Sequence, residues 1–119
     1  MPARDTTASS PPIAELKAEL FKALSHPTRI RVLEILSEGE RSVGDIQAIV
    51  EIEASNLSQQ LAVLRRAGVV TARKEGSMVF YALADEHLVE LLIAAKQVLI
   101  NSLTHTQGLL DDLRNAVDE

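Results

Sequence analysis

One change of periodicity constrains this chain more than any other feature. Leu57, Leu61 and Leu64 recur at intervals of four and three residues, which is the spacing of one buried face of an α-helix. Gly68 follows at the place where a helix C-terminal cap belongs. From Val69 onward the pattern changes to short β-prone runs. The sequence therefore predicts a helix that passes directly into β structure.

The β-prone region predicts a hairpin. Its two runs cover residues 69–74 and 78–83, and Glu75-Gly76-Ser77 between them is a turn signal. Arg73 and Lys74 lie near the tip of this hairpin.

The residues before the leucine-bearing helix predict three further helices. Apolar spacing indicates one helix at 13–24 and a second at 27–37, where Pro27 suits a first helical turn. Ser42 is placed to cap a short third helix, and Ser55 to cap the fourth, leucine-bearing one. A short turn at 51–55 makes the last two a helix-turn-helix, and the hairpin then forms its wing.

Beyond Asp85 a wide apolar stripe predicts a long last helix, in which Gly108 is a candidate break or kink. The predicted fold class is mainly α with a small β-hairpin, a winged helix-turn-helix in the order α-α-α-α-β-β-α. Residues 1–12 are small, polar and proline-bearing, which predicts a disordered N-terminal arm. The folded domain is then 13–119.

Composition limits the function classes. A chain of 119 residues with 46% hydrophobic and 3% aromatic residues suits one helical domain, which often completes its core by pairing with a second copy. The absence of cysteine excludes disulfides and thiolate metal sites. No apolar run approaches the roughly 18 residues that span a bilayer, so we expect a soluble, cytoplasmic protein with no membrane partner. Three histidines without a glycine-rich phosphate loop or a paired acid/base motif argue against an enzyme.

Charge is distributed unevenly along the chain. The net charge is −5, yet residues 53–77 carry four basic and two acidic side chains and are the only net-basic segment. The last segment, 78–119, carries two basic and seven acidic side chains. A polyanionic partner is therefore compatible with the helix and hairpin of 53–77.

These motifs resemble the ArsR/SmtB family of winged-helix transcriptional regulators. The resemblance rests on "KALSHPTRIRVLEIL" (22–36), "RSVGDI" (41–46), "SNLSQQLAVLRRAGVVTARKEGSMVFYAL" (55–83) and the long helix after Asp85, which together cover most of residues 15–103. The resemblance implies a homodimer whose first and last helices form the subunit interface. It also implies that each fourth helix enters a DNA major groove while each wing follows the flanking backbone.

The residue types suit these implied roles. Uncharged amides and hydroxyls can donate to and accept from base edges, and Asn or Gln can bond adenine at two points. We therefore expect base readout, or its immediate support, from Asn56, Ser58, Gln59 and Gln60, although the family often has histidine at the position of Gln60. Contacts to phosphates, which position a protein without specifying sequence, are expected from Ser42, Ser55, Arg65, Arg73 and Lys74. Arg66 is more simply interpreted as part of a solvent-exposed helix face. Arg29 is a candidate structural tie between the second helix and a neighbouring element.

Many family members sense metals, and this chain carries only half of one family pattern. The thiolate site of the third helix is absent, since "RSVGDI" holds no cysteine. The site of the last helices begins with Asp85-x-His87, but the positions eleven and fourteen residues beyond His87 hold Val98 and Asn101.

His105 is a candidate substitute ligand. It lies eighteen residues beyond His87, which is about 27 Å along an uninterrupted helix. An antiparallel partner helix that crosses near Lys96 could bring His105 towards the other subunit's His87. Imidazole and carboxylate ligands suit nickel or zinc. The alternative to a metal site is that Asp85 caps the last helix and His87 is a plain surface residue.

The sequence thus predicts a dimeric, sequence-specific DNA-binding regulator, a repressor of its own operon, that is controlled by nickel or zinc or by another signal. Two alternatives stay open. One is a metal-independent regulator, and the other is a winged-helix interaction module controlled by a partner protein.

Overall fold

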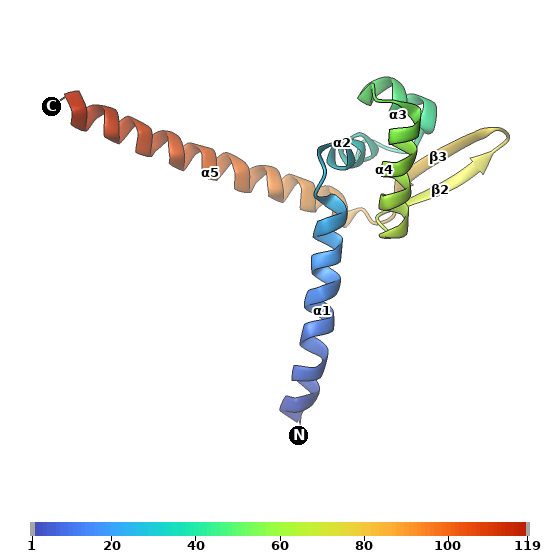
Figure 1. Ribbon diagram of the computed structural model, residues 1–119, viewed down its shortest axis with the longest axis horizontal. Coiled ribbons are helices and arrows are strands. Elements are labelled where there is room, and N and C mark those ends of the chain that lie inside the picture. Colours follow the sequence, from blue (N-terminus) through green and yellow to red (C-terminus); the bar gives the residue numbers. More distant parts are fainter. Residues whose placement is uncertain (1, 119) are drawn as a thin grey trace. The chain divides into compact units, whose positions relative to one another are not determined.

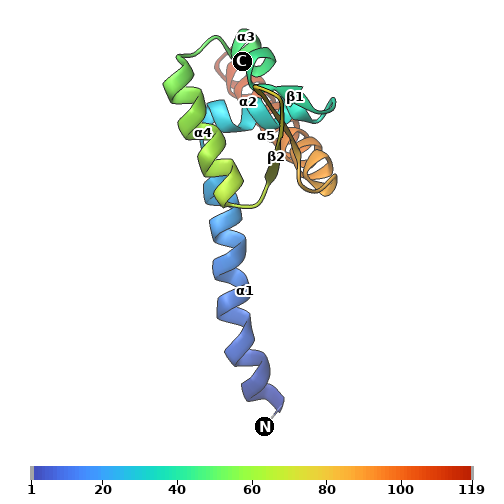
Figure 2. The same ribbon diagram turned by 90° about the vertical axis from the view of Figure 1, so that its right-hand side faces the viewer.

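The computed structural model describes the backbone of residues 2–118 and the side chains of residues 12–115. Its elements are α1 (Pro2–Leu24), α2 (Pro27–Leu36), β1 (Arg41–Ser42), α3 (Val43–Val50), α4 (Ala54–Arg66), β2 (Val70–Glu75), β3 (Met78–Leu83) and α5 (His87–Asp118). Figure 1 labels all of them except β1, which is labelled in Figure 2. The chain divides into two compact units, one that ends at Glu86 and one that begins at His87. The fold class predicted from the sequence is confirmed, with one added strand.

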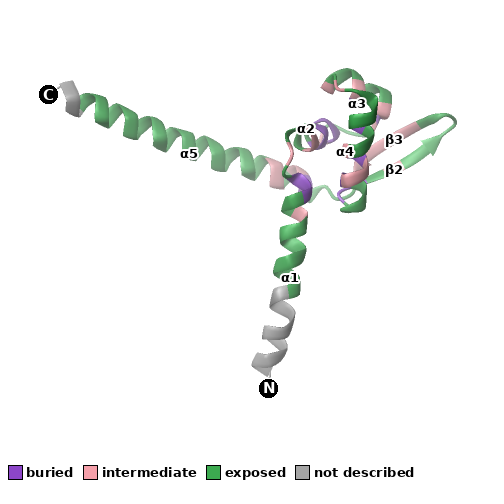
Figure 3. Ribbon diagram, viewed as in Figure 1, coloured by how far each residue is buried: buried purple, intermediate pink, exposed green. Residues whose placement is uncertain are grey.

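The core of the first unit lies between α2, α3 and α4. Its largest fully buried side chains come from these three helices: Val32, Leu33, Ile46, Leu57, Leu61 and Leu64. Figure 3 shows buried residues gathered in this region. The leucine stripe of 57, 61 and 64 is therefore the inward face of α4, as its spacing predicts.

Helix ends follow local hydrogen bonding. The Ser42 hydroxyl caps α3 by accepting from the Asp45 amide at 3.1 Å, as predicted. His26 caps α2 through its Nδ1, which accepts from the Thr28 amide at 3.1 Å. The predicted cap at Ser55 is wrong, because α4 begins at Ala54 and its N-cap is Glu53, two residues before Ser55, with no side-chain hydrogen bond.

Gly68 ends α4 as predicted. Its φ of +78° is left-handed, and its amide donates to the Arg65 carbonyl. The Val69 amide donates to the Leu64 carbonyl in the same turn. These two bonds form a Schellman motif, which satisfies carbonyls that the helix leaves without partners.

The wing is part of a three-stranded antiparallel sheet in the order β1-β3-β2. The last pair of the hairpin register is Glu75 with Met78, so the turn is the two residues Gly76 and Ser77. The strand β1, which the sequence did not predict, pairs Arg41 with Tyr81 and Ser42 with Phe80 (Figure 2). This strand pairing joins the start of α3 to the wing.

The helix α1 begins at Pro2, whereas the sequence predicts a disordered arm over 1–12 and a helix over 13–24. The side chains of residues 1–11 lie outside the described part of the chain, and the division of the chain at residue 12 stays a prediction. The second unit is the single helix α5, which continues through Gly108 without the break that this glycine suggested.

Candidate nucleic-acid interface

Polar side chains occupy the face of α4 that lies opposite its buried leucines. Leu57 and Leu64 are fully buried. Ser55, Asn56, Ser58 and Gln59 are exposed at the front of the same helix. Arg65, at its back, is exposed as well. The helix therefore presents uncharged donors and acceptors ahead of a basic end.

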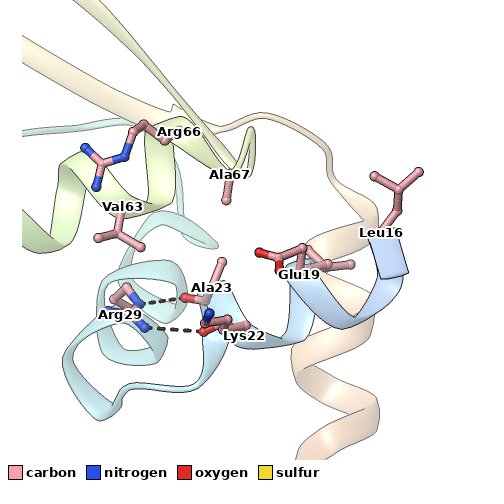
Figure 4. Close-up of a pocket in the computed structure, with 9 residues that line it drawn as sticks. Leu16, Glu19, Lys22, Ala23, Arg29, Val63, Arg66 and Ala67 are labelled. Carbon is pink, nitrogen blue, oxygen red and sulfur yellow. Dashed lines mark hydrogen bonds between the residues drawn. The ribbon is translucent and has the colours of Figure 1, made fainter. Parts of the chain in front are cut away.

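Gln60 differs from its neighbours because it is only half-buried and is bonded within the protein. Its Oε1 accepts from Nη1 of Arg29 at 2.9 Å, and its Nε2 donates to Oδ1 of Asn56 at 3.1 Å. Arg29 in turn donates through Nε to the Ala23 carbonyl at 2.6 Å and through Nη2 to the Lys22 carbonyl at 3.3 Å (Figure 4). Arg29 is therefore the structural tie that the sequence left open, and it joins α1, α2 and α4.

Ser42 serves the fold through its side chain. It is only 4% exposed, and its hydroxyl is engaged as the cap of α3. With Ser58 and Ser77 it lines a hollow of about 510 Å³ between α3, α4 and the wing. The structure thus brings Ser42 and Ser58, two of the predicted site residues, to one groove.

Arg73 lies on the wing with its guanidinium bonded to carboxylates. Nε and Nη2 donate to the two carboxylate oxygens of Glu40, each at 2.8 Å, and Nη1 donates to Glu75. The guanidinium carbon also lies 4.6 Å from the centre of the Phe80 ring, a cation–π distance. The hydrogen bond from Arg73 lowers the pKa of Glu40, and the bonds to Glu40 and Glu75 raise the pKa of Arg73.

The two predicted phosphate contacts of the wing therefore differ. Lys74 is exposed, so a phosphate could reach it directly. Arg73 would have to exchange a carboxylate for a phosphate. Sequence reasoning missed Glu40 because it lies 33 residues before Arg73, and no local pattern links the two.

The candidate metal ligands do not form a cluster in one chain. Within the described residues, no group of three or more His, Asp or Glu side chains is placed to hold a metal ion. His87 and His105 belong to the same unbroken helix α5, so about 27 Å of helix separates them. A single chain therefore does not fit a metal at these residues.

No helix in the described part of the chain is long and apolar enough to cross a membrane.

A large apolar surface lies on α5, whose residues are exposed along most of its length (Figure 3). Leu99 is 62% exposed and Leu103 is 67% exposed. Further exposed apolar side chains of α5 are Ile93, Val98, Ile100, Leu109, Leu110 and Leu113. A helix this apolar and this exposed is expected to pack against another surface.

A short helix, a turn and a polar-faced helix, followed by a β-hairpin, define a winged helix-turn-helix protein, a class that binds DNA. Residues 26–72 match the family model described as bacterial regulatory protein, arsR family. This chain belongs to the ArsR/SmtB family of winged helix-turn-helix transcriptional regulators, as its motifs indicate.

Individual relatives agree with this assignment. The HTH-type transcriptional regulator Rv0081 of Mycobacterium tuberculosis is 52% identical over 106 residues, which are 88% of this chain and 93% of the relative. The crystal structure of Rv0081 superposes with a TM-score of 0.74 over 80% of this chain and 96% of that chain.

The names of two more distant relatives state a function and an assembly. The biofilm growth-associated repressor of Agrobacterium fabrum is 44% identical over 77 residues, 65% of this chain and 66% of the relative. The solution structure of the homodimeric winged helix-turn-helix DNA-binding domain of Mb0332 from Mycobacterium bovis is 30% identical, with a TM-score of 0.71 over 78% of this chain and 86% of that chain.

Proposed function

We propose that this chain is a homodimeric repressor that binds operator DNA specifically and controls its own operon. The observation that carries the proposal is the front of α4, where Asn56, Ser58 and Gln59 are exposed opposite fully buried leucines. Uncharged hydrogen-bonding side chains on a rigid helix can distinguish base edges in a major groove. Basic side chains at the same positions would favour all sequences through attraction to the phosphates.

Base readout and positioning fall to different residues in this proposal. Asn56, Ser58 and Gln59 contact base edges, and Gln60 supports Asn56. Ser55, Arg65 and Lys74 contact phosphates, which fix the register of the protein on the duplex. Arg73 contacts a phosphate after it releases the carboxylates of Glu40 and Glu75. Ser42 contacts a phosphate at the groove that it shares with Ser58.

The exposed apolar surface of α5 and the exposed apolar residues of α1 support the proposed homodimer. Leu16 and Phe21 of α1 are 70% and 56% exposed, comparable to Leu99 and Leu103 of α5. Burial of such side chains contributes roughly 25 cal/mol per Å², the largest favourable term available to association. A second copy of the chain supplies the same apolar surface, as two-fold symmetry requires.

A gel-shift assay with DNA from upstream of the chain's own gene tests the proposal. The expected result is a shifted complex that survives unlabelled random DNA and weakens steeply as salt rises. A transcription assay in vitro should then show less transcript when the protein is added. Loss of the complex in random competitor DNA would contradict specific binding, and an increase in transcript would contradict repression.

The signal that releases the operator is proposed to be a metal, nickel or zinc, held between two subunits. His87 of one protomer would meet His105 of its partner, with Asp85 as the carboxylate, because one chain holds these histidines far apart. Calorimetry tests this: nickel or zinc should bind the wild type, and His87→Ala should weaken binding. Unchanged affinity in His87→Ala would favour the alternatives, a metal-independent regulator or control by a partner protein.

A further inference from the structure

A chain of hydrogen bonds runs from the end of α1 to the exposed front of α4. Arg29 binds the carbonyls of Lys22 and Ala23, which are among those that α1 leaves without helical partners. The same guanidinium donates to Gln60 at 2.9 Å, and Gln60 donates to Asn56 at 3.1 Å. Three nitrogens of the guanidinium are therefore hydrogen-bonded, to Ala23, Lys22 and Gln60, and these bonds hold Nη1 beside α4. Figure 4 shows the anchored arginine with its two carbonyl partners.

The chemistry of arginine fixes the orientation of the Gln60 amide. A guanidinium only donates hydrogen bonds and has no acceptor. The carbonyl oxygen of Gln60 must therefore face Arg29, because the reverse orientation would put an NH₂ group against N–H donors. The Gln60 Nε2 then points along α4 towards Asn56, one helical turn before it.

The fixed amide of Gln60 imposes an orientation on Asn56 in turn. The Gln60 Nε2 only donates, so it requires the Asn56 Oδ1 as its acceptor. The Asn56 Nδ2, with two donor hydrogens, is then the remaining polar atom of an exposed side chain. Asn56 therefore presents donors outward, and its carbonyl is committed inward.

We propose that Arg29 is a positioning residue that, through Gln60, sets Asn56 as a hydrogen-bond donor and thereby determines which base Asn56 selects. A donor group matches the acceptor edges of guanine (N7 and O6) and thymine (O4), and it is mismatched to the N4 donor of cytosine. Two-point bonding of adenine needs the amide oxygen as well, so it is disfavoured for Asn56. This inference rests on the proposed function, because it assumes that the front of α4 reads bases.

The decisive variant is Gln60→Glu. A carboxylate still accepts from Arg29, and the charge strengthens that bond. Its other oxygen also only accepts, so Asn56 must turn its NH₂ inward and present Oδ1 outward. The variant should therefore invert the preference at one operator position, from guanine or thymine to cytosine. Adenine presents both an acceptor (N7) and a donor (N6), so it can pair with either orientation of Asn56.

The experiment selects binding sites from a random DNA library for each variant and then measures affinities on the selected sites. Asn56→Ala first identifies the position that Asn56 reads, as the position where preference disappears. At that position the wild type should favour guanine or thymine over cytosine by about tenfold or more. Gln60→Glu should reverse that ratio, and Gln60→Met should bring it close to one.

Two controls separate orientation from charge and from stability. Gln59→Glu adds the same charge at the neighbouring exposed residue, which is outside the hydrogen-bond chain, and should weaken binding without changing preference at the Asn56 position. Arg29→Met should relax that preference, while Arg29→Lys, which keeps a donor, should retain more of it. A purely structural role for Arg29 would lower the melting temperature and leave base preference unchanged.

The outcomes are distinguishable. If the wild type selects no sequence, the proposed function fails. If the wild type selects a sequence but Gln60→Glu keeps the wild-type base at the position that Asn56→Ala identifies, this inference fails alone. This inference also fails alone if Asn56→Ala leaves the base preference unchanged at every operator position. Inversion in Gln60→Glu, without inversion in Gln59→Glu, supports it.

Discussion

At the scale of single residues, exposure and bonding separate the polar side chains of α4 into different roles. Gln59 is exposed at the front of the helix, whereas Gln60 is half-buried and engaged with Arg29 and Asn56. Adjacent residues of the same type thus differ in what they offer to a ligand. Lys74 of the wing is exposed, and its charge suits a phosphate rather than a base edge.

We expect Gln59→Ala and Lys74→Ala to affect DNA binding differently. Loss of a base contact at Gln59 should cost about 1–3 kcal/mol on the specific site and relax base preference at one position. Loss of a phosphate contact at Lys74 should weaken binding to all sequences and reduce the salt slope by about one. Fluorescence anisotropy at several salt concentrations measures both. Equal effects of the two variants on specific and random DNA would contradict the division of roles.

A substitution at Gly68 tests how α4 ends. Its backbone is left-handed, and a Cβ added there would meet no atom within 4 Å, so strain alone should make Gly68→Ala unfavourable. We expect a loss of about 1–2 kcal/mol in the free energy of unfolding. Gly44→Ala in α3 is the matched control, because its Cβ would make only an ordinary 3.9 Å contact with the Ser42 Oγ. Urea denaturation that shows equal losses in both variants would argue against the Schellman motif as the cause.

At the scale of elements, two long-range polar contacts hold the parts of the first unit together. Arg29 links α1, α2 and α4, and Arg73 links the wing to Glu40, which lies just before β1. Both arginines bind more than one acceptor, a geometry that suits the fork of a guanidinium.

The wing contact predicts a pH dependence. The pKa of Glu40 is lowered from its ordinary value of 4.5 by the hydrogen bond from Arg73. The contribution of this pair to stability is therefore fully present above about pH 4.5 and is lost as the pH falls through the lowered pKa of the folded state. Glu40→Gln should melt at a lower temperature than the wild type at pH 7, and the gap should shrink as the solution is acidified.

The control for this prediction is Glu40→Gln in an Arg73→Gln background. Without the guanidinium, the same change should produce no gap that depends on pH. A gap that is as large in this background as in the wild type would show that Glu40 acts through another partner.

The sequence predicts what local patterns encode and misses contacts between distant residues. The buried face of α4, the Gly68 stop and the hairpin follow from spacing and turn residues, and all three are confirmed. The strand β1 was missed because two residues show no alternation. The bonds from Arg29 to Gln60 and from Arg73 to Glu40 span 31 and 33 residues, so nothing in the neighbouring sequence announces them. The cap of α4 was misplaced because Ser55 is a better cap by type than Glu53.

At the scale of the whole molecule, the apolar surface of α5 predicts assembly. Leu99→Asp should convert a dimer into a monomer, because the change places a charge among exposed apolar residues that a second copy would bury. Gln97→Asp is the matched control, since two residues turn a helix by about 200° and place it on nearly the opposite side. Analytical ultracentrifugation should find Leu99→Asp at half the wild-type mass and Gln97→Asp unchanged. A dimeric Leu99→Asp would place the interface elsewhere.

Specific recognition of DNA by the front of α4 is the central claim, and one titration tests it most directly. The affinity of the wild-type protein is measured for its upstream operator and for a scrambled sequence of equal length, over a series of salt concentrations. The account predicts that the operator binds at least about 10³-fold more tightly and that affinity for both falls linearly with salt on logarithmic axes. Equal affinity for the two sequences at every salt concentration would contradict it.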